Sequence, residues 1–443
     1  MTQDLQGTRN NFHETRTWGA FLVAGYILLV AMPLLLAYSA QNRELHGLTT
    51  EFALAAGLAA FTILSLQPLL AARLRWMERP FGLDRLLHFH RTMAVVAVLL
   101  LLAHPLLLAA GHGNWSLVTT PGMPWPIQLG RLALLMAVFG GAVALLRRTL
   151  PLDYNRWRTL HKSMVFVPLL ALVHSLIVGD DLENPGLQAY WFALLGLCLF
   201  GFGWRNFYLP FWGARTMRVA EVKPESDNAT TLVLDPEDSK PLAQHPGQFW
   251  FLRLQGEGHR AEEHPFTIAS SPEAPLPCST IQHAGNFTKT IPQTRVGDRA
   301  RVLGPYGRFS TAFHAADAYV FIAGGIGITP LMSMLRHLRD TGDEREALLL
   351  WGNHEEADLL FRDELEQMPA HLRTVHTLTE PPKDWTGATG RITKEMIAEH
   401  AAALLPHAQL FVCGPPPMMD AIVGGLEKLG VAKKRIHTER FSL

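Results

Sequence analysis

Two stretches decide the architecture of this chain: HRTMAVVAVLLLLAH at residues 90–104 and HKSMVFVPLLALVH at residues 161–174. Each is an apolar run that begins and ends with histidine. The four histidines are His90, His104, His161 and His174. Imidazole is costly to leave in hydrocarbon and is a good haem ligand. At about 1.5 Å per helical residue, each pair is separated by roughly 20 Å along a helix axis. Each helix therefore offers one ligand near each face of a membrane, and two such helices are suited to hold two stacked haems.

Six apolar runs in the first half of the chain approach the roughly 17–25 residues that span a bilayer. They lie near 18–39, 49–72, 89–110, 128–146, 162–178 and 188–209. The first run is too long for the apolar core of a cleavable signal peptide and lacks a cleavage site, so we expect it to be a retained span. Residues 1–212 are therefore predicted to form an all-α bundle of six transmembrane helices.

The charges of the loops predict the orientation of this bundle. Arginines follow the second and fourth spans: Arg73, Arg75, Arg79, Arg85, Arg147, Arg148, Arg156 and Arg158. Basic loops usually stay in the cytoplasm. By contrast, the loop at 112–127 carries no charged residue other than histidine, and acidic residues follow the fifth span. We therefore expect both termini in the cytoplasm and the protein in the cell (inner) membrane.

Cysteine content and charge exclude several classes of protein. Only Cys198, Cys278 and Cys413 occur, too few and too scattered for a disulfide framework or a four-cysteine iron–sulfur cluster. The formal net charge is zero and no long basic run is present, so we expect no nucleic acid partner. The sequence shows no internal repeat.

The third and fifth spans are expected to run in the same direction. His90 then pairs with His161 around an inner haem, and His104 pairs with His174 around an outer haem. At about 100° per residue, a 14-residue step returns to within about 40° of its start, whereas a 13-residue step misses by about 140°. Pro168 lies inside the second interval, and an interior proline commonly kinks a helix or accompanies a π-bulge. We predict an irregularity between His161 and His174 that restores their common aim.

Other interpretations of the histidines stay open. A single buried histidine is more often hydrogen-bonded to a neighbouring helix than bound to a cofactor, although two matched pairs favour haem. His88 and His112 are alternative ligands on the inner and outer sides. Two residues apart on a helix means faces about 200° apart, so His88 and His90 cannot both point inward.

Several of these features resemble the ferric reductase and NADPH oxidase family. They are His90-Arg91, the paired spacings, and the approach Trp157-Arg158-Thr159-Leu160-His161. In that family the four histidines ligate two b-type haems. The resemblance thus implies His90, His104, His161 and His174 as the metal ligands here.

Residues 213–312 contain short strands broken by Gly, Pro and Asp, which predicts a small antiparallel β-barrel. Within it, His264-Pro265-Phe266-Thr267 resembles the flavin signature of the same family. There the Thr hydroxyl contacts the isoalloxazine and the first residue lies near the phosphates. Gly285-Asn286-Phe287-Thr288 is expected to approach the pyrophosphate through backbone amides and the Thr288 hydroxyl. With Gly304-Pro305-Tyr306-Gly307 closing the barrel, the set resembles the FAD domain of ferredoxin reductases.

Residues 313–443 alternate between strands and helices, which predicts an α/β nucleotide-binding domain. Gly324-Gly325-Ile326-Gly327-Ile328-Thr329-Pro330 follows an apolar strand and opens a helix, so a pyrophosphate can rest on the helix N-terminus. It departs from the G-x-G-x-x-G fingerprint. Phe411-Val412-Cys413-Gly414-Pro415 resembles the second nicotinamide motif of the family, in which the Cys lies near the nicotinamide. We expect the two motifs to meet at the strand ends of one sheet.

The last residues are Glu439-Arg440-Phe441-Ser442-Leu443. Relatives end on an aromatic that covers the flavin until nicotinamide displaces it, so the resemblance implies this role for Phe441. Packing of the last strand is the alternative. Glu355 and Glu356 stand where an Arg usually holds the 2′-phosphate of NADPH, which favours NADH. Arg362 is the residue that would accommodate NADPH.

These features predict an oxidoreductase that carries electrons from NADH or NADPH through FAD, which splits the hydride into single electrons, and two haem b groups to an extracytoplasmic acceptor. Oxygen-reducing relatives have a further His one turn beyond the outer ligand, where this chain has Leu108, and Thr49-Thr50-Glu51 lacks their oxygen-pocket Arg. A ferric or other metal chelate is therefore the favoured acceptor. Oxygen is the next candidate, and a relay to a periplasmic protein or quinone is the third. A soluble flavin reductase on an inert anchor would bind no haem.

Overall fold

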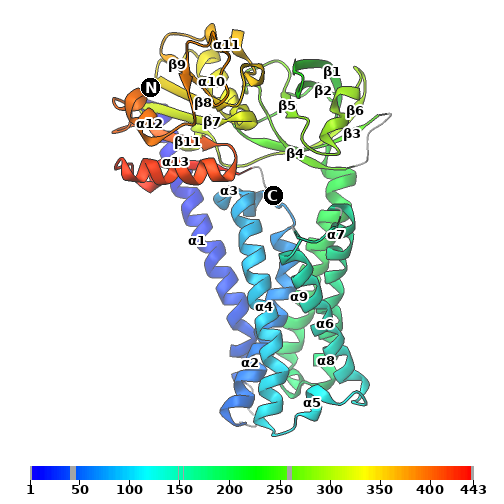
Figure 1. Cartoon of the computed structure of the whole chain (residues 1–443). Helices are drawn as coiled ribbons and strands as arrows, with labels where there is room; N and C mark the ends of the chain where they lie inside the picture. The colour runs from blue at the N-terminus through cyan, green and yellow to red at the C-terminus, as the bar shows by residue number, and fades with distance from the viewer. Residues whose placement is uncertain (1, 40–45, 148, 153, 257–261, 441–443) are drawn as a thin grey trace. The chain divides into compact units, whose positions relative to one another are not determined.

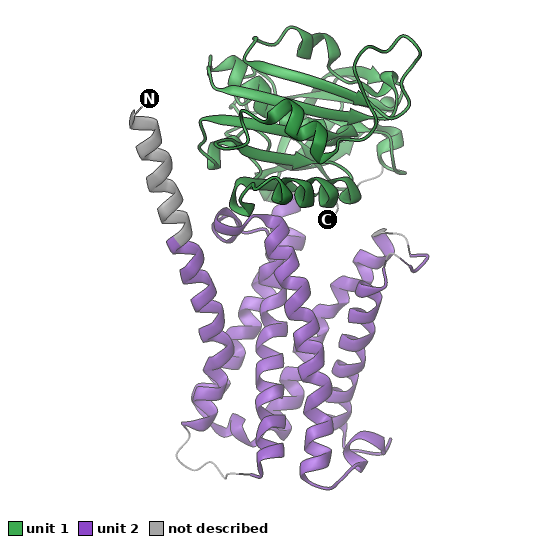
Figure 2. Cartoon of the chain, turned by 60° about the vertical axis from the view of Figure 1, so that its left-hand side comes forward, with its two compact units in different colours: residues 1–13, 212–443 green, residues 14–211 purple. Residues whose placement is uncertain are grey.

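The computed structural model describes residues 2–39, 46–147, 149–152, 154–256 and 262–440, without the side chains of residues 2–16 and 154. The chain forms two compact units (Figures 1 and 2). One unit comprises residues 14–211, and the other comprises residues 1–13 and 212–443. The first unit is helical, and the second contains the β-sheets.

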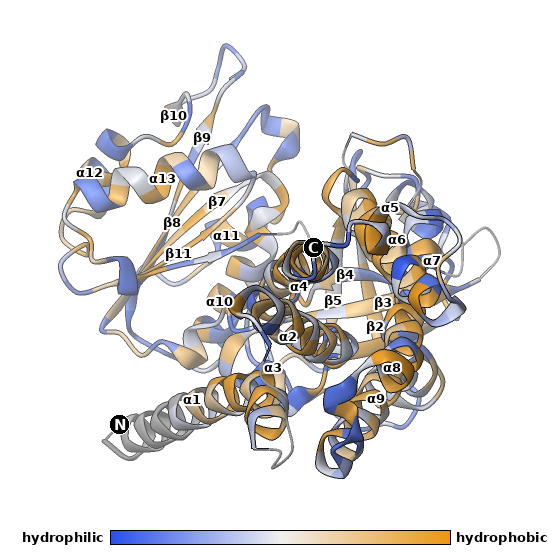
Figure 3. Ribbon diagram, turned by 90° about the horizontal axis from the view of Figure 1, so that it is seen from below, coloured by the Kyte–Doolittle hydropathy of each residue, from blue (hydrophilic) through white to orange (hydrophobic). Residues whose placement is uncertain are grey.

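Within the described residues of the first unit, six helical segments are long and apolar enough to cross a membrane, as predicted. They lie in α1 (Thr2–Tyr38), α2 (Leu48–Leu70), α4 (Leu83–Gly111), α6 (Trp125–Leu145), α7 (Tyr154–Lys162) with α8 (Phe166–Val178), and α9 (Pro185–Gly203) with the π-helix Trp204–Gly213. Two short helices, α3 (Arg75–Phe81) and α5 (Ser116–Thr119), lie in the loops. α2 packs along α4 and α9, and α6 packs along α8. Apolar residues dominate these helices, as the colouring of Figure 3 shows.

Local chemistry sets several of the helix boundaries. α9 begins at Asn184, whose side-chain oxygen accepts hydrogen bonds from the amides of Gly186 and Leu187, while Pro185 occupies the first helical position. α3 ends at Gly82, which has a φ of 84°. Glycine adopts such a positive φ at little energetic cost. The chain can therefore turn there directly from α3 into α4.

The fifth span is interrupted between His161 and His174, which confirms the predicted irregularity. The interruption is a 3₁₀ turn at Ser163–Val165 rather than a π-bulge. Pro168 has no amide hydrogen for the carbonyl of Met164, four residues earlier, which lies in that turn. A 3₁₀ turn advances by about 120° per residue, so three residues reduce the mismatch between the two histidines from about 140° to about 80°. The turn therefore restores the predicted common aim only in part.

The first sheet of the second unit is antiparallel and has the strand order β4-β3-β6-β1-β2-β5. Its strands are β1 (Arg215–Ser226), β2 (Ala229–Pro236), β3 (Phe249–Gln255), β4 (His264–Thr267), β5 (Cys278–Gln282) and β6 (Arg299–Tyr306). β4 and β5 end the order yet contact each other, so the sheet curls around a core that includes Leu232, Trp250 and Leu252. The predicted antiparallel FAD domain is confirmed.

The second sheet is parallel and has the order β10-β9-β8-β7-β11-β12. Its strands are β7 (Ala318–Gly324), β8 (Glu346–Asn353), β9 (Leu372–Leu378), β10 (Ala388–Thr389), β11 (Gln409–Cys413) and β12 (Ile436–Glu439). The order reverses between β7 and β11. In doubly wound sheets, ligands bind outside the carboxyl ends of the strands at such a switch point.

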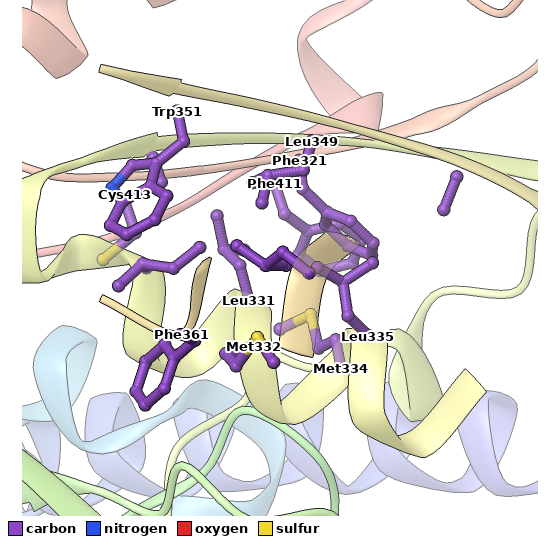
Figure 4. Close-up of a cluster of buried hydrophobic side chains, with 14 of the residues drawn as sticks. Phe321, Leu331, Met332, Met334, Leu335, Leu349, Trp351, Phe361, Phe411 and Cys413 are labelled. Carbon is purple, nitrogen blue, oxygen red and sulfur yellow. The ribbon is translucent and has the colours of Figure 1, made fainter. Parts of the chain in front are cut away.

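Helices cover both faces of this sheet because the side chains of β7 alternate between them. Phe321 joins the core beneath α10 (Ile328–Asp340), where Leu331 and Leu335 gather with Leu349 and Phe411 (Figure 4). Val320 and Ile322 face the core under α12 (Lys394–Ala401) and α13 (Pro416–Lys428). A strand buried on both faces accounts for the continuous apolar run in its sequence.

Candidate functional site

The inner histidines lie together, His90 on α4 and His161 on α7. Their ring centres are 6.2 Å apart. At metal–imidazole bonds of about 2 Å, two imidazoles on opposite sides of one ion have ring centres roughly 6 Å apart. The Nδ1 of His90 lies 3.2 Å from the carbonyl oxygen of Gln67. The Nδ1 of His161 is buried and has no hydrogen-bond partner among the described residues, and its ring stacks on Trp157.

The outer histidines are His104 on α4 and His174 on α8. The Nδ1 of His104 lies 2.8 Å from the carbonyl oxygen of Ala53. The Nδ1 of His174 lies 2.8 Å from the carbonyl oxygen of Pro126. His104 is close enough to His174 for the two rings to interact electrostatically. The structure therefore brings each histidine of the third span to the expected histidine of the fifth.

These hydrogen bonds fix the tautomer of three histidines. A carbonyl oxygen only accepts, so the Nδ1 atoms of His90, His104 and His174 carry the proton and each Nε2 keeps its lone pair. Metal-ligating histidines almost always donate their other N–H to a carbonyl, carboxylate or water. The side chains of His88 and His112 are exposed instead. The ligand role of the four histidines stays a prediction, but their geometry fits it.

The donor set suits an iron that brings most of its own ligands. No group of three or more His, Cys, Asp or Glu side chains in the described part of the chain is arranged to hold a bare metal ion. A porphyrin supplies four nitrogens to its iron and needs only two axial ligands from the protein. Two histidines at each level match that requirement.

The flavin motif forms β4, which pairs with β3. Phe287 stacks on two residues of this strand, with its ring centre 4.2 Å from that of His264 and 6.2 Å from that of Phe266. The Nε2 of His264 lies 3.0 Å from the carboxylate of Glu262. The Glu262 carboxylate thus already occupies the Nε2 of His264, which its place in the motif would otherwise offer to a phosphate. Thr267 is buried at the end of the strand.

The turn that is expected to contact the pyrophosphate is held by hydrogen bonds within the turn. The Gly285 amide donates to the Thr288 hydroxyl at 2.8 Å, and that hydroxyl donates to the Gly285 carbonyl at 3.3 Å. Thr288 then opens the 3₁₀ helix Thr288–Gln293. A phosphate bound here would have to replace these two hydrogen bonds.

The two nicotinamide motifs meet at the switch point of the parallel sheet. Ala323 at the end of β7 pairs with Cys413 at the end of β11. A Cβ on Gly327 would collide with the Cys413 carbonyl oxygen, and a Cβ on Gly414 would lie 3.1 Å from the Gly324 amide nitrogen. Only glycines permit this approach. The glycine turn is followed directly by α10, whose N-terminus has no side-chain cap.

The glycine turn continues into the first turn of α10. Gly325 has a φ of +52°, and the Thr329 hydroxyl donates to the Ile326 carbonyl at 3.1 Å. Pro330 lies in the same turn. Because proline has no amide hydrogen, this position adds no donor that would lack a partner in the first turn of the helix. Pro415 is the N-cap residue of α13, after Gly414. Both loops thus end in helix N-termini at the same edge of the sheet.

Cys413 is fully buried beside a carboxylate that the sequence did not assign. Burial raises the pKa of the Cys413 thiol well above its usual value, and the charge of Glu439 acts in the same direction. Glu439 lies opposite Cys413 in the pairing of β11 with β12. Only this strand register identifies it as a site residue. Phe441, the expected flavin cover, lies outside the described residues.

The expected ribose region is dominated by carboxylates. Glu355 caps the turn Glu356–Asp358. The guanidinium of Arg362 is bound by Glu356 and by Glu366, the latter at 3.1 Å. Glu356 and Arg362 line a cavity of about 470 Å³ together with His376 and Trp385. Arg362 is therefore already neutralised by protein carboxylates.

Comparison with known families divides the chain in the same way. Residues 56–172 match the family described as ferric reductase like transmembrane component, and residues 321–424 match the oxidoreductase NAD-binding domain. The first match contains His90, His104 and His161 and ends two residues before His174.

Individual relatives and a solved structure match larger or smaller parts of the chain. The reductase subunit of stachydrine N-demethylase from Rhizobium meliloti (strain 1021) is 31% identical over 244 residues, 53% of this chain and 69% of that protein. NADH–cytochrome b5 reductase 1 of Arabidopsis thaliana is 36% identical over 151 residues, 33% of this chain and 54% of that protein. The chain thus spans about half the length of that reductase. The solved flavohemoglobin from Malassezia yamatoensis, with bound FAD and heme, aligns at a TM-score of 0.49 and 19% identity, covering 88% of this chain and 99% of that chain.

Proposed function

Because the chain belongs to the ferric reductase family of membrane NAD(P)H-dependent flavin oxidoreductases, we propose that it carries electrons across the membrane. The donor is NADH in the cytoplasm, the carriers are FAD and two b-type haems, and the acceptor lies on the outer side. FAD and NAD(P)H binding follow from the matched domains. We propose in addition that the protein binds two haems, that electrons move outward across the membrane, and that the acceptor lies on the outer side.

One observation supports the assignment of the four histidines as haem ligands. Histidines at two levels of α4 face histidines of the fifth span, and three of the four donate Nδ1–H to a backbone carbonyl of a neighbouring helix. Nε2 is thereby free to ligate iron. Histidines that served only to hold helices together would not need to meet in pairs. His90 and His161 would hold the inner haem, and His104 and His174 the outer haem.

The residues at the carboxyl ends of β7 and β11 would hold the nicotinamide cofactor. The amides after Gly324, Gly325 and Gly327 face its pyrophosphate, with Thr329 and Pro330 in the first turn of α10 and Gly414 and Pro415 opposite. Cys413 would lie near the nicotinamide as a buried, neutral thiol, and Phe441 would cover the flavin. Pro265, Phe266 and Thr267 would present β4 to the isoalloxazine.

The outer surface favours a metal chelate as the acceptor. Glu51, at the outward start of α2, is buried and accepts hydrogen bonds from the Tyr38 hydroxyl at 3.0 Å and the His46 amide at 2.9 Å. A carboxylate at this position offers no positive charge to stabilise superoxide as it forms, whereas an arginine would. The arginine-rich loops after the second and fourth spans support an inner-membrane protein whose second unit and both termini lie in the cytoplasm.

The carboxylates around Arg362 favour NADH over NADPH. A 2′-phosphate brought to this region would meet Glu355 and Glu356, and Arg362 is already bound to Glu356 and Glu366. Like charges at short range disfavour binding. The same carboxylates can accept hydrogen bonds from a ribose hydroxyl.

Stopped-flow spectroscopy of the purified protein tests the acceptor. The protein is reduced with NADH under anaerobic conditions and mixed with ferric citrate, with air-saturated buffer or with a soluble periplasmic fraction. Rapid reoxidation of the haem bands by ferric citrate alone is the expected result. Reoxidation by oxygen alone would make the protein an oxidase, and reoxidation only by the periplasmic fraction would make it a relay to a protein partner.

A further inference from the structure

The outer imidazoles each pack against a glycine of another helix. A Cβ added to Gly57 on α2 would lie 2.8 Å from the Nδ1 of His104. A Cβ added to Gly130 on α6 would lie 2.8 Å from both the Nδ1 and the Cε1 of His174. These distances are inside the contact range of carbon and nitrogen atoms, so any larger residue would displace the ring.

In both places the glycine and the hydrogen-bond acceptor belong to one helical turn. His104 donates to the carbonyl of Ala53, four residues before Gly57, and His174 donates to the carbonyl of Pro126, four residues before Gly130. In an α-helix the carbonyl of residue i already accepts from the amide of residue i+4. A carbonyl has two lone pairs, so the imidazole can add a second bond to the same oxygen. We call each glycine with its acceptor carbonyl an outer socket.

The two outer sockets are a repeat in three dimensions that the sequence does not show. One is on α2 and receives a histidine of α4, and the other is on α6 and receives a histidine of α8. Glycine weakens a helix interior relative to alanine. Its presence opposite a histidine in two separate helices is therefore explained by the room that the imidazole needs.

The inner pair is held differently. The His90 bond to the Gln67 carbonyl is 3.2 Å, and Ala71 rather than glycine stands four residues after that acceptor. His161 has no acceptor for its Nδ1 among the described residues. The outer pair thus makes two bonds of 2.8 Å, whereas the inner pair makes one longer bond.

Resting on the haem function proposed above, we infer that Gly57 and Gly130 are positioning residues of the outer ligands, and that the outer haem consequently has a lower midpoint potential than the inner haem. A hydrogen bond from Nδ1–H to an acceptor makes the imidazole more basic, which stabilises ferric over ferrous iron. Two short bonds therefore lower the potential more than one long bond.

One nearby charge acts against this ordering. Arg131 adjoins Gly130, and a positive charge near a haem favours the ferrous state. Its guanidinium donates to the carbonyl oxygens of Ser116, Leu117 and Thr120. Those three dipoles offset the charge, so the histidine bonds are expected to dominate.

The test uses the full-length protein in detergent as wild type, Gly57→Ala, Gly130→Ala and His174→Ala. Gly141→Ala on α6 and Gly196→Ala on α9 are the matched controls, because an added Cβ meets only Val98 at 3.6 Å in the first and nothing within 4 Å in the second. The haem-to-flavin ratio and a potentiometric titration of the haem α-band are measured for each.

We expect wild type to titrate in two steps, with the lower-potential step absent from His174→Ala. In Gly57→Ala and Gly130→Ala that step should shift to higher potential or be lost, while the other step and both controls stay as in wild type. Wild-type steps in the opposite order, or glycine variants with unchanged steps, would overturn the inference. If a glycine variant loses both haems, the order of the two midpoint potentials in the wild-type protein decides whether the inference holds. A wild-type protein without haem would instead refute the proposed function.

Discussion

Cys413 is buried and Cys278 is half-buried, and the surroundings of both thiols keep them neutral. Burial raises the pKa of each above the ordinary thiol value. Because the thiolate is the reactive form, we predict that iodoacetamide at pH 8 alkylates neither residue in the native protein and both after denaturation. Peptide mass spectrometry measures this directly. Native labelling of Cys413 would contradict its description as a buried, neutral contact.

The same burial links the stability of the second unit to pH. The folded-state thiol pKa lies above the unfolded value of about 8.5, so the folded state binds more protons in this range. The contribution to stability is full below the unfolded pKa and is lost as the pH rises toward the folded one. Cys413→Ala should therefore lose less stability than wild type between pH 7.5 and pH 9.5, measured by thermal release of flavin. Equal losses in both proteins would argue against this linkage.

Glu356 is predicted to control the choice of nucleotide. Glu356→Gln removes a carboxylate that binds Arg362 and would repel a 2′-phosphate. We expect kcat/KM for NADPH to rise on the order of tenfold, equivalent to about 1.4 kcal/mol, with little change for NADH. Glu366→Gln is the control, since it also frees one bond of Arg362 but lies farther along α11 (Arg362–Glu366). If both variants change kcat/KM for NADPH equally, Glu356 does not by itself control the choice of nucleotide.

At the residue scale, the sequence identified groups that carry their chemistry in a side chain, such as the paired histidines. It did not identify Glu439, because that carboxylate reaches Cys413 only through the register of two strands. Nor did it identify the partners of the histidines. Those partners are backbone carbonyls of Ala53, Gln67 and Pro126, which every residue possesses.

α10 connects the nicotinamide site to the flavin strand. Beyond its glycine turn, Ser333 accepts a hydrogen bond from the Gly247 amide and donates to the Ser270 carbonyl at 2.7 Å. Arg336 donates to the Ala269 carbonyl at 2.8 Å and forms two bonds with Glu364. The segment at Ala269 and Ser270 directly follows β4. One helix thus ties the two cofactor-binding domains together.

Removing Arg336 should loosen this tie. Arg336 has a side-chain exposure of 14%, so Arg336→Met leaves a carbonyl and part of a carboxylate without their buried partner. We expect a loss of about 2 kcal/mol in unfolding free energy, measured by urea titration of flavin fluorescence. Arg339→Met removes a more exposed partner of the same Glu364 and should cost less than about 1 kcal/mol. A larger loss in Arg339→Met would contradict this ranking.

At the element scale, long apolar runs and glycine-bounded strands were predictable because length and periodicity decide them. The fifth span shows the limit. Its 13-residue spacing and Pro168 predicted an irregularity, but the choice of a 3₁₀ turn depends on packing against neighbouring helices that the local sequence does not contain. The turn at Gly285 was likewise predicted to approach a pyrophosphate, but the hydrogen bond between its amide and Thr288 could not be predicted from the sequence.

At the scale of the whole molecule, the order of parts follows from the change in sequence pattern at about residue 212. Six apolar spans give way to alternating short strands and then to strands with helices. The acceptor is not predictable in the same way, because the outward loops contribute few charged side chains and no sequence motif of their own. The contacts of Glu51 there became visible only in the structure.

The central claim is that four histidines hold two haems in one membrane unit. It is tested most directly by the pyridine haemochrome spectrum and FAD content of the purified wild type, His104→Ala and His174→Ala, with exposed His112→Ala as the control. We expect two b-type haems per FAD in wild type and in the control, and about one in each ligand variant. A wild type that contains flavin but no haem, or ligand variants with undiminished haem, would contradict it.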